Sequence, residues 1–173
     1  MIELSLIPPE LGTLGLEIIQ RYGMVALFIL FILEGAMLLF IAPSESLVPV
    51  AIASMSTTQE YALVIALSVT GATIGQYALF TLAKRGGKEY LVENRWFRIN
   101  DERIDKYERW FSRWGPGIVL LSNTLPFVRG LFTVPAGVAE LSDRQFVVYS
   151  ALGTLCFETL LAFATLGVLT HFG

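Results

Sequence analysis

The stretch SNTLPFVRGLFTVPAGVA, residues 122–139, decides how this chain folds, because it places an arginine inside an apolar run. Arg129 lies between Pro126 and Pro135 and is the only charged residue in the apolar region 117–139. A charged side chain at membrane depth costs about 2.5–3.5 kcal/mol on insertion scales. We therefore expect Arg129 to face the protein interior and to have a function there.

The composition around this stretch is that of a membrane protein. Of 173 residues, 54% are hydrophobic and 16% are charged, whereas a typical globular domain has about 25% charged residues. The mean hydropathy is +0.64. There are four apolar regions: 24–42, 61–83, 117–139 and 146–170. The second and fourth predict transmembrane helices, since a hydrocarbon core of about 30 Å takes about 20 helical residues.

The first and third apolar regions differ, because each carries a charge and prolines. Glu34 lies in the first region and Arg129 in the third. The predicted helix breaks are Pro43, Pro49, Pro126 and Pro135. Proline removes a backbone donor, and unpaired backbone groups cannot face lipid. Residues 34–57 and 114–140 are therefore predicted to be re-entrant segments that face the interior; ordinary proline-kinked spanning helices are the alternative.

The segment between the two halves, residues 84–113, is strongly basic. It holds nine of the twelve Lys and Arg residues, with aromatic residues at helical spacing. This pattern predicts an amphipathic helix in the membrane interface, on the cytoplasmic side. The charges either recruit anionic lipid or only set the topology. The first twenty residues favour a further interfacial segment, and without a basic n-region they do not predict a removable signal peptide.

Two similar twelve-residue stretches suggest an internal repeat. VPVAIASMSTTQ (48–59) and VPAGVAELSDRQ (134–145) share five identical positions, and a long apolar run follows each. We predict an all-α, multi-pass fold of one membrane domain. Its inverted repeat comprises a first half (1–83), the linker (84–113) and a second half (114–173), each half pairing a re-entrant helical hairpin with a transmembrane helix.

Arg129 is the centre of the predicted site. It stays charged and offers five donors, and its natural partner in a dry site is a carboxylate or a phosphate. One interpretation is that Arg129 and Asn123 bind a lipid phosphate while Glu34 and Glu45 exchange protons or gate the site, since a carboxyl group out of water takes up a proton more readily. The other is that Arg129 pairs permanently with Glu34 or Glu45.

Several other residues are weaker candidates or argue against enzyme chemistry. Glu158 and Gln76 are secondary candidates for the site, and either could instead hydrogen-bond between helices. GATIG (71–75) predicts a small-residue face for close helix packing. His171 and Cys156 are the only histidine and cysteine. These counts argue against histidine-based catalysis and metal binding, so we expect neither an enzyme nor a cofactor.

These motifs together resemble the DedA family, the prokaryotic relatives of the VTT-domain lipid scramblases, over residues 34–167. Glu34 followed by APSES (42–46) resembles the family's first re-entrant loop, an acid and then Pro-Gly-Asp/Glu. GQYALFTLAKRGG (75–87) resembles its G-D-x-x-x-Y-x-x-G-R-x-x-G helix end. NTLPFVRGLFTVPAG (123–137) resembles R-F-x-P-x-x-R followed by Ala-Gly, with Arg129 on the second arginine.

The sequence also departs from that pattern. Asn123 stands where the family's first arginine is expected, and Gln76 replaces the acid after glycine. Further replacements are Phe80, Ala83 and Lys84. The resemblance identifies a short member that lacks a last C-terminal helix. It implies a plasma-membrane lipid translocase, a flippase or scramblase for polyprenyl-phosphate carriers or phospholipids, driven by protons in some members.

Two other functions stay open from the sequence. The glutamates could serve a proton- or ion-coupled cation antiporter with Arg129 as a counter-charge, or the chain could be a scaffold that does not transport and binds through its basic linker. The expected partners are membrane lipids and protons, with no nucleic acid, and homo-oligomer formation is left open.

Overall fold

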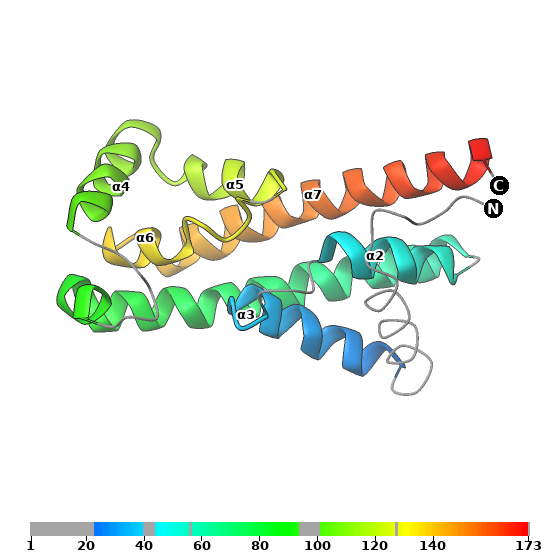
Figure 1. The fold of residues 1–173 in the computed structure, drawn as a ribbon, viewed down its shortest axis with the longest axis horizontal. Helices are drawn as coiled ribbons and strands as arrows, with labels where there is room; N and C mark the ends of the chain where they lie inside the picture. The colour runs from blue at the N-terminus through cyan, green and yellow to red at the C-terminus, as the bar shows by residue number, and fades with distance from the viewer. Residues whose placement is uncertain (1–22, 40–43, 56, 94–100, 127, 173) are drawn as a thin grey trace.

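The computed structural model describes residues 23–39, 44–55, 57–93, 101–126 and 128–172, and the described residues are helical apart from turns (Figure 1). The predicted all-α fold class is confirmed. The helices are Gly23–Gly35, α2 (Ser44–Ala53), α3 (Thr58–Glu93), α4 (Asp101–Trp114), α5 (Gly117–Thr124), α6 (Thr133–Val138) and α7 (Asp143–Phe172).

The two long helices, α3 and α7, lie side by side and run in opposite directions (Figure 1). Within them, Thr58–Gly86 and Asp143–Val168 are long and apolar enough to cross a membrane. The two predicted spanning helices are therefore confirmed in position. In Figure 1 the helix Gly23–Gly35 and α2 flank the right half of this pair, and α5 and α6 flank the left half. None of these four flanking helices has the length of a span.

The two long helices begin in the same way. Before α3, the Thr57 hydroxyl accepts a hydrogen bond from the Glu60 amide at 3.3 Å, and the Glu60 carboxylate accepts one from the Thr57 amide at 3.0 Å. Before α7, the Ser142 hydroxyl accepts a hydrogen bond from the Gln145 amide, also at 3.3 Å. Both starts follow the Ser/Thr-x-x-Glu/Gln capping pattern. The two similar sequence stretches thus adopt one local structure, a short helix, a turn and a capped long helix.

Two of the four prolines predicted to break helices do not break them. Pro49 lies inside α2, which continues through it to Ala53. Pro135 is the third residue of α6, and the first-turn amides of a helix have no partner within the helix, so proline is tolerated there. Pro126 follows the end of α5 and does lie in a break. Pro43 lies outside the described residues.

The small-residue face predicted on α3 packs against the helix Gly23–Gly35. A Cβ atom added to Gly75 would overlap the carbonyl oxygen of Ile32, and one added to Gly35 would overlap the carbonyl oxygen of Ala72. A Cβ on Gly71 would come within 2.8 Å of the Phe31 Cβ. The two backbones therefore touch, which brings the end of the helix Gly23–Gly35, with Glu34, to the middle of α3.

Each half of the molecule has its own apolar core. The first contains Leu27, Phe31, Val48, Ala51, Ile52, Val64 and Ala162, together with Leu47. The second contains Phe80, Ile118, Val119, Phe132, Ala136 and Phe146. Helix α4 closes the second half, where Trp110 stacks on Phe132 with 5.4 Å between ring centroids. Helix α3 continues to Glu93, so the predicted linker 84–113 begins inside it.

Candidate functional site

The site begins with a stripe of buried residues on α7. Ser150, Thr154 and Glu158 are each fully buried, one helical turn apart. They continue a row in which Phe146 belongs to the second apolar core and Ala162 to the first. At 1.5 Å per residue, Glu158 lies roughly 22 Å from the start of the apolar span of α7 and roughly 15 Å from its end. Ser150, Thr154 and Glu158 therefore form a polar layer in the central part of the apolar span of α7, between the two apolar cores.

Arg129 enters this layer from the turn between α5 and α6. The turn begins where α5 ends at Thr124 and follows Pro126, and it includes Gly130 with φ +73°. That left-handed conformation favours glycine, and a Cβ on Gly130 would come within 3.1 Å of the Met37 Cε. The Arg129 side chain is only 9% exposed. The prediction that Arg129 faces the interior from a break between helices is confirmed.

The guanidinium of Arg129 binds two carboxylates. Its Nη1 donates a hydrogen bond to Glu158 Oε1 at 2.7 Å, and the same nitrogen lies 4.0 Å from Glu34 Oε1. The Glu158 side chain is completely buried, whereas that of Glu34 is 16% exposed. The guanidinium also lies over the buried Phe157 ring, 5.2 Å from its centroid, where the ring face attracts a cation.

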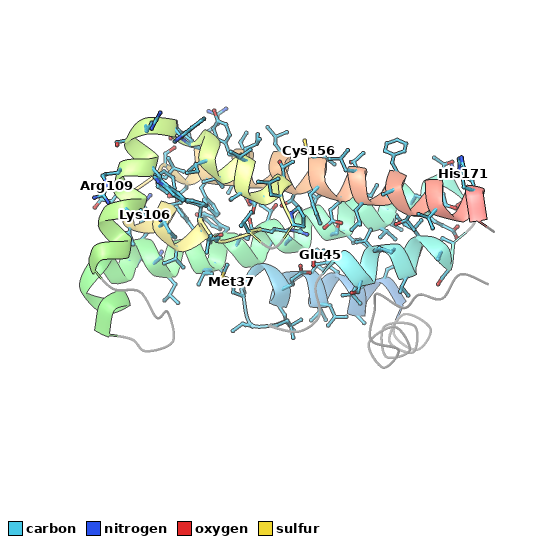
Figure 2. The ribbon with its side chains drawn as sticks, turned by 45° about the horizontal axis from the view of Figure 1, so that its top comes forward. Met37, Glu45, Lys106, Arg109, Cys156 and His171 are labelled. Atoms are coloured by element: carbon cyan, nitrogen blue, oxygen red, sulfur yellow. The ribbon has the colours of Figure 1, made fainter. Side chains whose placement is uncertain are left out.

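The other predicted acid, Glu45, lies in the first turn of α2 and is half-buried. It projects near the middle of the molecule, far from Lys106 and Arg109 at one end and His171 at the other (Figure 2). Its charge and that of Glu34 both act on the Glu158 carboxyl group. The fold therefore brings two acidic groups, Glu158 from α7 and Glu34 from the helix Gly23–Gly35, to Arg129.

Asn123 and Gln76 form a second buried cluster beside Arg129. The Asn123 Oδ1 accepts hydrogen bonds from Gln76 Nε2 at 3.2 Å and from the Gly130 amide at 2.9 Å. Its Nδ2 donates to Gln76 Oε1 at 3.0 Å and to the Ser150 hydroxyl at 3.2 Å. The Ser150 hydroxyl in turn donates to Gln76 Oε1. Through Gly130, this cluster holds the turn that carries Arg129.

Sequence reasoning did not find the pairing of Arg129 with Glu158. It offered Glu34 and Glu45 as partners, and Glu34 is indeed near, while Glu158 was only a secondary candidate. The signal was present: between residues 146 and 170 the only charged residue is Glu158, and between 117 and 139 it is Arg129. Charges at membrane depth pair with one another, so the isolated opposite charges of these two apolar regions were natural partners.

Three buried polar atoms near this layer have no hydrogen-bond partner among the described residues: Thr73 Oγ1 on α3, and Thr154 Oγ1 and Glu158 Oε2 on α7. Most buried polar atoms in proteins are paired. Thr154 and Glu158 are neighbours on one face of α7, since residues four apart in a helix lie close together. Arg129 lies beside them, so a hydroxyl, a carboxylate and a guanidinium group are close together in this part of the interior.

The profile of the VTT domain matches residues 42–167, which include α2 to α6, Arg129 and most of α7. The chain belongs to the VTT-domain family. The expectation of a DedA-type membrane protein is therefore confirmed. Two of the five departures from the DedA pattern, Gln76 and Asn123, bind each other in the structure.

Named relatives agree with this assignment. The chain is 32% identical over 101 residues to undecaprenyl phosphate transporter A of Bacillus subtilis, covering 58% of the chain and only 50% of that protein. It is 28% identical over 144 residues to the protein of the same name from Staphylococcus aureus, covering 80% and 70%. It is 25% identical over 154 residues to the uncharacterized membrane protein YbfM of Bacillus subtilis, covering 87% and 92%. No solved structure matches the chain.

Proposed function

We propose that this VTT-domain protein is a lipid translocase that carries the phosphate of a membrane lipid past Arg129. The observation that carries the proposal is the Arg129 guanidinium, which is 9% exposed, lies on a turn between two short helices and binds Glu158 in the apolar span of α7. A permanent cation is costly there and attracts a phosphate strongly. The lipid tail stays in the bilayer while the headgroup crosses, and no covalent chemistry is required.

We infer that a lipid headgroup can reach this site from either membrane face. We infer that the helix Gly23–Gly35 with α2, and α5 with α6, are re-entrant hairpins that enter from opposite faces. Their placement along opposite halves of the antiparallel α3–α7 pair supports this inference (Figure 1), as do the matching caps at Thr57 and Ser142. Inverted repeats of broken helices are a common plan for transporters, with the binding site where the breaks meet.

The lipid we propose is a polyprenyl phosphate, with a phospholipid as the other candidate. Two relatives are named as transporters of undecaprenyl phosphate. In this proposal Arg129 binds the phosphate, Asn123 supports it through Gly130, and Glu34 and Glu45 exchange protons with the two aqueous sides. Helix α4, with Lys106 lying 5.1 Å from the Trp110 ring centroid, lies at the cytoplasmic face of the plasma membrane, since aromatic and basic residues favour that interface.

A reconstituted flip assay tests this function. Vesicles that contain the wild-type protein should move a fluorescent short-chain polyprenyl phosphate between leaflets, and Arg129→Ala and Glu45→Gln should both slow this movement. The neutral polyprenol is the substrate control, and Glu140→Gln, an exposed acid outside the site, is the variant control. Wild-type rates in both Arg129→Ala and Glu45→Gln would overturn the mechanism.

A second function has one observation in its favour. Glu34 and Glu158 give the site two acids for the one arginine they contact, and an excess of carboxylate suits a cation. A proton- or ion-coupled cation antiporter would use these acids as ligands. Flux of a water-soluble cation that Glu34→Gln abolishes, and that does not depend on the lipid, would favour this function over lipid transport.

A further inference from the structure

The partner of Arg129 in the structure is a carboxylate in the middle of a spanning helix, and any phosphate that reaches Arg129 must share the guanidinium with it. We propose that Glu158 is a displaceable counter-ion, which holds Arg129 in the empty site and yields it to the lipid phosphate. This inference rests on the proposed function, because it assumes that a phosphate visits Arg129.

The charges around Arg129 favour the neutralisation of one carboxylate when a phosphate binds. One guanidinium already contacts the carboxylates of Glu158 and Glu34. A phosphate would add at least one further negative charge. In a site shielded from water, repulsion between like charges is much stronger than in solution, so binding is expected to be weak unless an acid is neutralised.

Burial singles out Glu158 as that acid. The Glu34 side chain is 16% exposed and Glu45 is half-buried, so water can reach both. Glu158 is completely enclosed on α7, and its backbone is held in a continuous helix of 30 residues. Its carboxylate cannot swing out to water when it leaves Arg129. It can be accommodated there only as the neutral acid, after taking up one proton from water.

The hydrogen bonds of Glu158 show that it is held at one point only. Oε1 accepts the bond from Arg129 Nη1 at 2.7 Å, whereas Oε2 has no hydrogen-bond partner among the described residues. A pair that holds both oxygens would be harder to exchange, because bidentate contacts are the strong ones. One turn earlier on the same face, the Thr154 hydroxyl also lacks a partner in the described structure. Once protonated, Glu158 and this hydroxyl are two neutral donors available to phosphate oxygens.

The test measures phosphate affinity directly, with the full chain in detergent micelles. The probe is farnesyl phosphate, the control ligand is farnesol, and calorimetry gives the dissociation constant. Glu158→Gln removes the charge but keeps the side-chain shape and an oxygen that can accept from Arg129. We expect it to bind the probe about tenfold more tightly, which corresponds to about 1.4 kcal/mol. Glu140→Gln, the same change at an exposed position, should leave the affinity unchanged.

The dependence on pH gives a second readout. A phosphate monoester itself changes charge near pH 6, so the informative quantity is the difference between the wild type and Glu158→Gln. The other charged groups around Glu158 are Arg129 from the turn, Glu34 from the first helix and Glu45 from α2, and all three are shared by both proteins. We expect the gain from Glu158→Gln to shrink as the pH is lowered, because acid favours the neutral carboxyl group of Glu158 in the wild type.

The outcomes separate this inference from the proposed function. An unchanged or weaker affinity in a folded Glu158→Gln variant, while Arg129→Gln loses binding, would overturn the counter-ion and leave the lipid site standing. Wild-type affinity in Arg129→Gln would overturn the lipid site itself. If Glu158→Gln does not fold, Glu158→Asp replaces it; this variant withdraws the carboxylate by one methylene, and tighter binding is again expected, whereas equal affinity would refute the counter-ion.

Discussion

The carboxamides of Gln76 and Asn123, on α3 and α5, face each other and exchange two hydrogen bonds of 3.2 and 3.0 Å. Both residues are almost completely buried. They are also two of the five positions at which the sequence departs from the DedA pattern given above, which has an acid and an arginine there. Because the two side chains bind each other, the two departures together put a neutral pair where the DedA pattern has two opposite charges. The charge beside Arg129 is the same in either case.

The amide pair is expected to stabilise the fold through a shared interaction. Gln76→Leu and Asn123→Leu each leave buried amide groups without partners, which costs about 1–3 kcal/mol per variant. The double variant should lose less than the sum, because both changes remove the same bonds. Denaturation in micelles measures the free energies of unfolding. Thr124→Val is the control, since that hydroxyl bonds only to the Leu120 carbonyl of its own helix; strictly additive losses would contradict the pairing.

Restoring the family's charges should work only when both are restored. Asn123→Arg alone buries a second cation beside Arg129, and Gln76→Asp alone buries another acid, so both single variants should be strongly destabilised. The double variant Gln76→Asp with Asn123→Arg should regain most of the lost stability and lipid movement. Melting temperature and the flip assay check this prediction. A double variant that is less stable than either single variant would show that the two side chains are not interchangeable as a pair.

Stability and transport should respond differently to removal of the Arg129 pair. Arg129→Gln leaves the enclosed Glu158 carboxylate and the partly exposed Glu34 carboxylate without their cation, and breaking a buried pair costs about 3–5 kcal/mol. Adding Glu158→Gln should recover most of that stability, because a neutral amide then replaces the completely enclosed carboxylate. Flip activity should stay absent in both variants, since the phosphate has lost its cation. Transport at the wild-type rate in the double variant would mean that Arg129 serves the fold alone.

The contact between α3 and the helix Gly23–Gly35 should not tolerate a methyl group. A Cβ on Gly75 would overlap the Ile32 carbonyl oxygen, which is backbone and cannot rotate away. Gly75→Ala should therefore destabilise the protein by about 1–3 kcal/mol and move Glu34 away from Arg129. Gly167→Ala on α7, with no atom within 4 Å, is the control and should be neutral or stabilising. Equal stability of the two variants would contradict the close approach.

Patterns within short stretches predicted much of this structure. The two spans follow from the length of their apolar runs, and Pro126 marks a true break. At Pro49 the local pattern gave the wrong prediction. A proline was expected to end the helix, yet α2 continues through it while packing its neighbours Val48, Ala51 and Ile52 into the first core. Tertiary packing outweighed the local cost of one missing hydrogen bond.

The sequence by itself determined that Arg129 faces the interior and lies between helices. A charge that faces lipid is costly, and the prolines on both sides disfavour one continuous helix through Arg129. Which groups meet Arg129 was decided by the tertiary structure. Glu158 is 29 residues away and Gln76 is 47 residues from Asn123. Those contacts depend on how α3 and α7 are rotated about their axes, and that rotation is set by glycine contacts and core packing across the whole domain.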